Sequence, residues 1–383
     1  MPELSSVDLL ARLVSFDTTS RNSNLPLIEF IEDYLDQFGI AHLRVDYEEG
    51  RKTNLYATIG PNVADGIVLS GHTDVVPVDG QKWMSDPFSL TEREGKLYGR
   101  GSADMKGFIA VALALVPHFK NLKLNQPIHF AFSCDEEVGC KGVRPLVAHL
   151  RDHLKRPRAV FVGEPTSMRV VNAHKSAVTF NTEVTGHEAH SSLTDRGVNA
   201  IMVAADVIGE ISALRRELIG AGDPTGRFEP PYSTIHVGVI NGGTAKNIVP
   251  RHCEFTWETR LLPTADHDLV PKRLEALRLK LEPGMKTVAQ DAGISTTQTN
   301  EVPGLKPEPD SVAENLALHA AGANATHAVS YCTEAGLFQQ IGIPAVICGP
   351  GNIQQAHKPD EFVDADQLKL CESFLKKLAE ACC

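Results

Sequence analysis

The chain has 383 residues and a formal net charge of −11, with 42% hydrophobic and 22% charged residues. This composition is typical of a globular protein, and the acidic balance argues against nucleic acid or an anionic membrane as a partner. The length is sufficient for two domains, each with its own hydrophobic core.

The first half of the chain alternates between helical and strand patterns. Alternation of this kind favours a mixed, mostly parallel sheet with helices on both faces, so we expect the α/β class. In chain order, apolar periodicity predicts helices over 5–16, 25–38, 106–119 and 143–154, and strands over 54–59, 67–70, 128–133 and 159–162. A polar connection over 83–97 and a glycine-rich loop over 99–104 precede the third helix.

The pattern changes in the middle of the chain. Strand patterns over 177–185, 233–239, 253–261 and 294–297 alternate with helical patterns over 198–218 and 269–281. The order β-α-β-β-α-β is that of a ferredoxin-like α+β domain. Helix, strand and helix patterns then resume over 312–321, 344–348 and 365–381. We therefore predict a larger domain of residues 1–177 and 301–383, interrupted by an inserted domain of residues 178–300.

The expected location is cytoplasmic. The first residues lack the basic and apolar regions of a secretory signal, and the apolar stretch 108–117 is too short to span a bilayer. The eight cysteines form no Cys-x-x-Cys pair, which favours free thiols in a reducing compartment.

Polar side chains that can bind metals follow the predicted buried strands. Because the carboxyl ends of parallel strands meet at one edge of a sheet, we expect these side chains to converge there. Two histidines and several carboxylates, without cysteine, suit a pair of divalent ions such as zinc that share one carboxylate. The alternative is that the acids cap helix N-termini. The residues are His72, Asp104, Glu136, Glu137, Glu164 and His357, and the carboxylate of Asp74 is close enough in the chain to hold the second nitrogen of His72.

Five segments resemble the signatures of the M20 metallopeptidase and deacylase family. They are residues 71–77, 101–107, 135–137, 163–166 and 355–361, in the order of the family and across nearly the whole chain. The resemblance implies a metal-dependent hydrolase with a zinc-exopeptidase-like catalytic domain. It also implies two divalent ions, zinc first with cobalt or manganese as alternatives, and an inserted lid that joins two copies into a homodimer.

The resemblance also implies roles for single residues. The bridging ligand would be Asp104, with His72 and Glu164 at one ion, Glu137 and His357 at the other, Asp74 orienting His72, and Glu136 acting as general base and then acid.

Three residues of the inserted domain match positions that act on substrate in relatives. His190 matches a lid histidine that reaches the partner subunit's site and stabilises the tetrahedral oxyanion. Asn247 and Arg260 match positions that grip the substrate's carboxylate. The structural alternatives are a turn histidine, a turn asparagine and an exposed strand arginine.

Within the family, residues 331–336 and 349–357 resemble members that remove the acetyl group from N-acetyl-L-ornithine. Glu334 would favour a substrate with a free side-chain amine. The alternative is that Glu334 caps a helix. Serine at Ser176, after Lys175, departs from the glycine expected in that branch. We therefore expect a small N-acyl amino acid as substrate, N-acetyl-L-ornithine, hydrolysed to L-ornithine and acetate. The alternatives are a succinyl-diaminopimelate desuccinylase, a general N-acyl-amino-acid deacylase, and a non-catalytic dimerising binding protein.

Overall fold

The computed structural model describes residues 3–383, and the chain forms two compact units. The first unit comprises Met1–Ala173, Leu305–Ala328 and Thr333–Cys383, and the second comprises His174–Gly304 and Val329–Cys332. The boundaries predicted at 177 and 300 fall inside strands β9 (Ala177–Thr185) and β12 (Gly293–Val302) of the second unit. These strands pair from Ala177 opposite Val302 onwards, so their outermost residues fold with the second unit.

An eight-stranded mixed sheet forms the centre of the first unit. Its order is β1-β2-β6-β3-β7-β14-β8-β13, and the central strands β6, β3, β7 and β14 run parallel. Every residue of these four strands is buried, which explains their uninterrupted apolar patterns. The strands are β1 (Ala41–Tyr47), β2 (Lys52–Ile59), β3 (Ile67–His72), β6 (Ile128–Ser133), β7 (Ala159–Pro165), β8 (Val171–His174), β13 (His327–Val329) and β14 (Ala345–Gly349).

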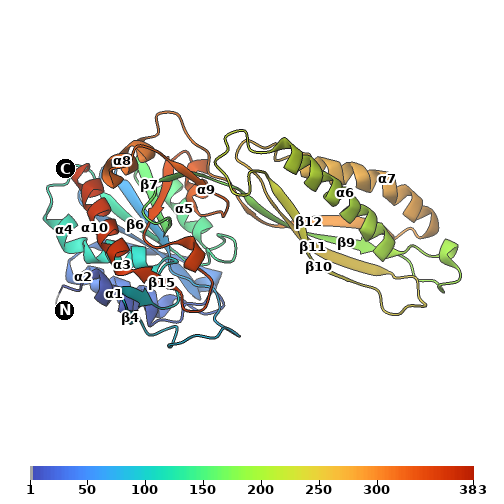
Figure 1. The fold of residues 1–383 in the computed structure, drawn as a ribbon, viewed down its shortest axis with the longest axis horizontal. Coiled ribbons are helices and arrows are strands. Elements are labelled where there is room, and N and C mark those ends of the chain that lie inside the picture. Colours follow the sequence, from blue (N-terminus) through green and yellow to red (C-terminus); the bar gives the residue numbers. More distant parts are fainter. Residues whose placement is uncertain (1–2) are drawn as a thin grey trace. The chain divides into compact units, whose positions relative to one another are not determined.

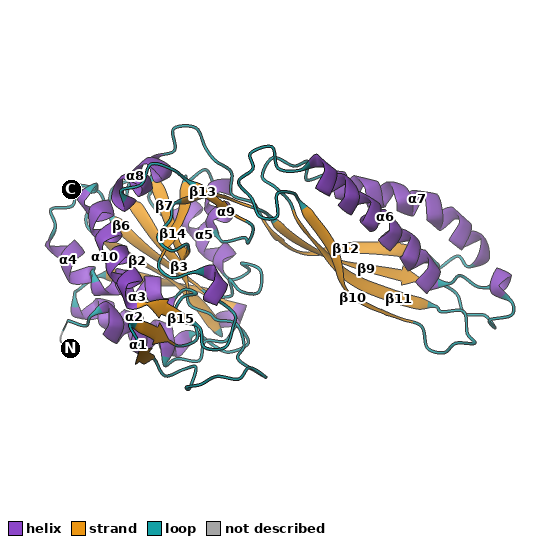
Figure 2. Cartoon of the chain, in the orientation of Figure 1, coloured by secondary structure: helices purple, strands orange, loops and turns teal. Residues whose placement is uncertain are grey.

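Helices cover both faces of this sheet, which confirms the predicted fold class (Figure 1, Figure 2). Helices α5 (Val143–His153) and α9 (Ala335–Gln340) contact each other and the sheet. The main core of the unit lies beneath the other helices, α1 (Ser6–Val14), α2 (Leu25–Gln37), α3 (Lys106–Ala114), α4 (Val116–Asn121), α8 (Val312–Ala321) and α10 (Ala365–Glu380).

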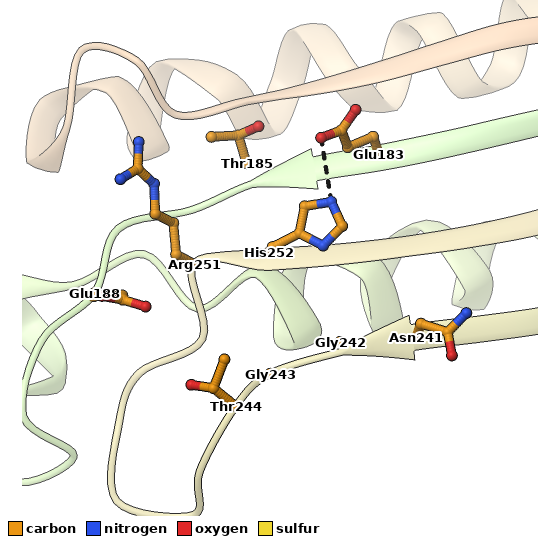
Figure 3. A pocket seen from close by; sticks show the side chains of 9 residues that line it. All are labelled: Glu183, Thr185, Glu188, Asn241, Gly242, Gly243, Thr244, Arg251 and His252. Atoms are coloured by element: carbon orange, nitrogen blue, oxygen red, sulfur yellow. Dashed lines mark hydrogen bonds and ion pairs between the residues drawn. The ribbon is translucent and has the colours of Figure 1, made fainter.

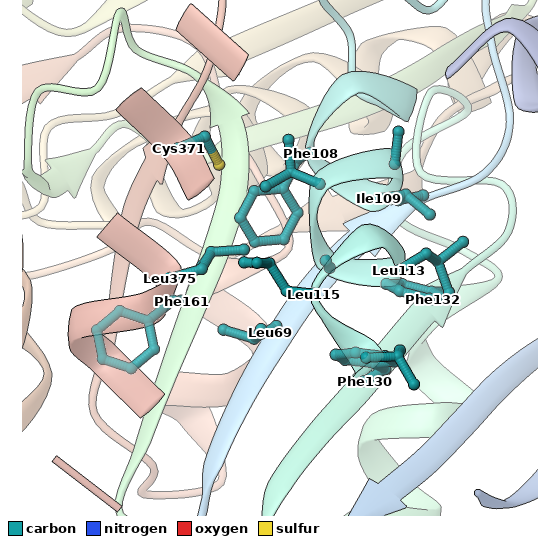
Figure 4. Packing of buried hydrophobic residues seen from close by; sticks show 14 of the residues in the cluster. Leu69, Phe108, Ile109, Leu113, Leu115, Phe130, Phe132, Phe161, Cys371 and Leu375 are labelled. Atoms are coloured by element: carbon teal, nitrogen blue, oxygen red, sulfur yellow. The ribbon is translucent and has the colours of Figure 1, made fainter. Parts of the chain in front are cut away.

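Helix α3 packs tightly against the central strands. Phe108 and Ile109 of α3 lie above side chains of β3, β6 and β7, including Leu69 and Phe161 (Figure 4). A β-carbon at Gly163 of β7 would lie 1.9 Å from Cγ of Phe108, so glycine is required for this close approach. The contact holds the N-terminus of α3 beside the ends of the parallel strands.

The structure corrects several predicted elements of this unit. The predicted helix over 106–119 is two helices, because Pro117 lacks the amide hydrogen that would continue the first. The predicted polar connection over 83–97 contains β4 (Thr91–Arg93) and the start of β5 (Lys96–Tyr98). With β15 (Phe362–Asp364), these strands form a small sheet in the order β15-β5-β4.

The second unit is a four-stranded antiparallel sheet with two helices on one face (Figure 1). Its sheet order is β10-β11-β9-β12, with β10 spanning Thr234–Gly242 and β11 spanning His252–Arg260. Helix α6 (Ala200–Ala221) follows β9, and α7 (Leu269–Val288) follows β11, which gives the chain order β-α-β-β-α-β. The rings of Phe180 and Trp257 stack at 4.1 Å in the core.

Helix α7 continues beyond the predicted end at 281, through Pro283. Met285, past the proline, is buried in the core of this unit. Burial of its side chain offsets the backbone hydrogen bond that proline removes.

Two further findings bear on the chain as a whole. Within residues 3–383, none of the helices is long and apolar enough to cross a membrane. All eight cysteines are free thiols.

Candidate metal centre

The ends of neighbouring parallel strands carry most of the candidate ligands. His72 is the last residue of β3, Glu164 lies near the end of β7, and Glu136 and Glu137 follow β6. Asp104 precedes helix α3. Because β6, β3 and β7 are adjacent and parallel, their carboxyl ends bring these side chains to one edge of the sheet.

Asp104 lies between two imidazoles. Its Oδ1 is 3.1 Å from Nε2 of His72, and its Oδ2 is 3.2 Å from Nε2 of His357. Nε2 of His72 is also 3.7 Å from Oε1 of Glu164, and Nε2 of His357 is 3.1 Å from Oε2 of Glu137. The five side chains therefore form two sets that share one carboxylate, and their assignment to ions stays a prediction.

This donor set fits divalent ions. Ligand atoms of His72, Asp104 and Glu137 lie within 4.8 Å of one another, as do those of His72, Glu136 and Glu164. Asp104 and Glu164 are only 5% and 4% exposed, and such buried carboxylates require nearby positive charge. Nitrogen and oxygen donors without sulfur are suited to zinc, and also to cobalt or manganese.

The crowded carboxylates and imidazoles have altered pKa values. Burial and the neighbouring charge of Asp104 raise the pKa of Glu137 to about 7. Burial tends to lower the pKa of His72, but the hydrogen bond to Asp104 raises it well above its ordinary value. Hydrogen bonds to Asp104 and Glu137 raise the pKa of His357 to about 10. At neutral pH, protons therefore compete with divalent cations for these ligands.

Asp74 contacts His72 through its backbone. Nδ1 of His72 is 2.9 Å from the carbonyl oxygen of Asp74 and 3.7 Å from the nearer carboxylate oxygen. A proton on Nδ1, donated to this carbonyl, leaves Nε2 free to bind a metal. The Asp74 carboxylate instead accepts the backbone N–H groups of Glu136 and Glu137, at 3.1 and 3.2 Å. The carbonyl oxygen of Asp74 thus makes the shorter contact and its carboxylate the longer one, and the role of Asp74 in orienting His72 stays a prediction.

Glu136 is buried beside the two sets of ligands. Burial raises its pKa to about 8; His72 acts against this rise, and the neighbouring Glu137 and Asp74 add to it. The thiol of Cys140, four residues on, donates to Oε1 of Glu136 at 3.2 Å. Nothing in the sequence singles out Cys140, because a thiol four residues after an acid carries no signal of its own.

Asp135, next to Glu136, is fixed by a buried ion pair. Nζ of Lys52 is 2.7 Å from both carboxylate oxygens of Asp135 and 2.6 Å from the carbonyl oxygen of Ser20. Asp135 has φ of 51°, a left-handed conformation that aspartate adopts only occasionally. The pair stabilises the turn that presents Glu136 and Glu137.

Glu334 is bonded to two strands of the central sheet. Its side chain is fully buried, and its two oxygens accept hydrogen bonds from Oγ of Ser70 at 2.6 Å and Oγ of Ser133 at 2.7 Å. Burial raises the pKa of this carboxyl group. The carboxylate contacts strands β3 and β6 and does not cap helix α9, and its contact with a substrate stays a prediction.

The other three predicted substrate residues lie in the second unit. His190 is exposed, with Nδ1 2.7 Å from Oγ of Ser192. The backbone N–H of Ser191 donates to the carbonyl oxygen of Asn247 at 3.1 Å, so His190 and Asn247 lie on neighbouring loops. Arg260, at the end of β11, is half-buried, and its Nε donates to Glu258 at 3.1 Å.

A hollow of about 560 Å³ in the second unit contains none of the predicted site residues (Figure 3). His252 and Glu183 pair across it at 3.2 Å, and their side chains are about half exposed. Since water already solvates these charges, the hollow gives no reason to expect a ligand.

The chain resembles known proteins over nearly its whole length. Residues 68–381 match the model of Peptidase family M20/M25/M40. An acetylornithine deacetylase of Myxococcus xanthus is 35% identical, with 98% of this chain and 96% of that protein covered. An acetylornithine deacetylase of Pasteurella multocida is 34% identical, with 100% of this chain and 95% of that protein covered.

The fold is also that of a solved structure. The YXEP protein of Bacillus subtilis, a dinuclear metal-binding peptidase of the M20 family, has a TM-score of 0.69 and 17% identity, with 98% of this chain and 96% of that chain covered.

Zinc binding is expected to release protons from this site. The raised pKa values of His72 and His357 mean that both imidazoles carry a proton at pH 7, and a metal must displace it. The apparent zinc affinity should therefore rise with pH between about 6 and 8. Isothermal titration calorimetry in buffers of different ionisation enthalpy measures the zinc affinity and the number of protons released on binding. Zinc affinity that does not change with pH, with no proton release, would contradict the arrangement.

Proposed function

The chain belongs to Peptidase family M20/M25/M40, and we propose that it hydrolyses N-acetyl-L-ornithine to L-ornithine and acetate. The shared carboxylate of Asp104, with one imidazole on each side, is the observation that carries the hydrolytic reaction. The substrate assignment is supported by the acetylornithine deacetylases that match along the whole chain. The reaction would supply ornithine for arginine biosynthesis, and we propose a cytoplasmic location.

Two divalent ions, zinc in the first instance, are proposed as the cofactor. Asp104 would hold both ions, with His72 and Glu164 at one and Glu137 and His357 at the other. When bound, such a pair polarises an amide carbonyl and lowers the pKa of water, which is the chemistry that amide hydrolysis requires.

Glu136 is proposed as the group that moves the proton. Its carboxylate lies within 4.8 Å of ligand atoms of His72 and Glu164, so it can reach a water at the same position. Burial raises its pKa to about 8, and nearby cations would lower that value towards neutrality. A group that titrates near neutral pH can accept a proton from water and then donate it to the leaving amine.

His190 is proposed to act on the substrate of a second copy, where it would donate a hydrogen bond to the oxyanion. The exposure of His190 supports a role that needs a partner. Asn247 and Arg260 are proposed to bind the substrate's carboxylate. We do not assign a substrate contact to Glu334, because both of its oxygens already accept hydrogen bonds inside the core.

We propose that the second copy binds along β10 and makes a homodimer. This strand is an edge of its sheet, so one side of its backbone is available for pairing. Val239 and Ile240 on β10 are 56% and 51% exposed, and Met202 on α6 is 63% exposed. Large apolar side chains gathered beside a free strand edge favour association with an identical chain.

The proposed substrate is tested by comparing kcat/KM for N-acetyl-L-ornithine, N-acetyl-L-methionine and N-succinyl-diaminopimelate. We expect roughly 10-fold or greater preference for N-acetyl-L-ornithine, since N-acetyl-L-methionine lacks its side-chain amine and the succinyl compound carries a larger, charged acyl group. A chelator should abolish the activity and added zinc should restore it. Preference for the succinyl compound would identify a desuccinylase, and broad activity would identify a general deacylase. Failure of the zinc-loaded protein on all three would favour a binding protein.

Replacing Glu136 by glutamine is expected to remove turnover and keep the metal. Glu136→Gln has the same shape but cannot accept a proton, so kcat should fall by about 10²-fold or more. Glu137→Gln, one residue along, is the matched variant and should instead lose metal content. Turnover and zinc per chain measure the two effects. Normal turnover in Glu136→Gln would rule out its role as the base.

A further inference from the structure

The least protected of the candidate ligands is His357. Its side chain is 53% exposed, whereas that of Asp104 beside it is 6% exposed. Its φ is 64°, a left-handed conformation that non-glycine residues rarely adopt. An exposed side chain on such a backbone has no core packing to orient it. Contacts to its own loop must therefore hold it towards Asp104 and Glu137.

A buried ion pair joins the loop of His357 to the loop of Asp104. Arg100 and Glu361 are each 1% exposed, and Nη1 of Arg100 donates to Oε2 of Glu361 at 2.6 Å. The other oxygen of Glu361 accepts the backbone N–H groups of Ala103 and Asp104, at 3.0 and 3.1 Å. Glu361 comes four residues after His357 and so connects the two loops directly.

The same arginine is linked to the backbone of His357 through Gln81. Nη2 of Arg100 donates to Oε1 of Gln81 at 2.7 Å, and Nε1 of Trp83 donates to the same oxygen at 3.0 Å. These two donors fix the orientation of the Gln81 amide. Its Nε2 then donates to the carbonyl oxygen of His357 at 3.0 Å.

We propose that Arg100, Glu361 and Gln81 are positioning residues for one of the two metal sites. The three side chains form a brace that holds the backbones of Asp104 and His357 at the separation needed to share an ion with Glu137. The proposal rests on the two-metal site proposed above. Hydrogen bonds outside the ligand sphere commonly change metal affinity by about 10–100-fold, so the brace should set the affinity of this ion.

Among residues 3–383, no hydrogen bond or ion pair joins Arg100, Glu361 or Gln81 to His72 or Glu164. Nε2 of His72 faces Asp104 and Glu164, and its Nδ1 faces the carbonyl oxygen of Asp74. His72 and Glu164 lie on buried central strands, which orient them without the brace. Loss of the Gln81 contact, which holds His357 alone, should therefore weaken one ion much more than the other.

Gln81→Glu tests the hydrogen bond from Gln81 to His357 most selectively. It keeps an oxygen for Arg100 and Trp83 but replaces the amide that donates to His357 by a second oxygen. Gln354→Glu is the matched control, because it adds the same charge on the exposed surface of the loop that carries His357. Glu361→Gln keeps the shape of the side chain but loses its charge. It tests the part of the brace that holds Asp104.

Zinc titration of the three variants and the wild type, with zinc per chain determined after gel filtration, tests the proposal. Wild type and Gln354→Glu are expected to bind two zinc ions. Gln81→Glu should bind one ion with unchanged affinity and the other about 10-fold or more weakly, with its thermal unfolding temperature close to that of wild type. Glu361→Gln, if folded, should weaken the same ion and, through the shared Asp104, the other ion as well.

Two results would overturn the brace. One is wild-type affinity for both ions in Gln81→Glu. The other is an equal loss at both ions, which indicates a general structural role. A wild-type chain that binds fewer than two zinc ions would overturn the two-metal site and the brace with it. If wild type and Gln81→Glu both bind two ions with the same affinity, only the brace is wrong and the proposed function is unaffected.

Discussion

The Asp104 carboxylate, held between two imidazoles, is the interaction on which the rest of the site depends. One oxygen faces His72 and the other faces His357, at 3.1 and 3.2 Å. Two further carboxylates, Glu137 and Glu164, lie beside this arrangement in a largely buried position. So many acidic groups cannot remain ionised together without compensating positive charge. The need for cations is therefore built into the folded chain.

The scaffold positions the ligands for these cations in two ways. Strands β3 and β7 hold His72 and Glu164 in place, because every residue of both strands is buried. His357 and Asp104 lie instead on loops, and their positions depend on long-range polar contacts. The ion pair between Arg100 and Glu361 is the centre of those contacts. One half of the site thus derives its geometry from core packing and the other from buried hydrogen bonds.

The sequence was most informative where local pattern decides structure. Apolar runs located the parallel strands, and a polar residue after each run located the edge at which His72, Glu136 and Glu164 meet. Local sequence pattern gave no information where contacts between distant residues determine the structure. Glu361 acts on Asp104 across 257 residues, and nothing beside either residue indicates the contact. In the same way, nothing beside Glu334 in the chain indicates its hydrogen bonds to Ser70 and Ser133, and β4, β5 and β15 are strands only because they pair with each other.

Diffraction from crystals of the zinc-loaded protein at the zinc absorption edge tests the central claim most directly. We expect two anomalous peaks roughly 3.5–4 Å apart, one on each side of the Asp104 carboxylate. One ion should be bound by His72 and Glu164, and the other by His357 and Glu137. A single peak, or a second ion held by Glu136 in place of His357, would contradict the shared-carboxylate site and the role of Glu136 as the group that moves the proton.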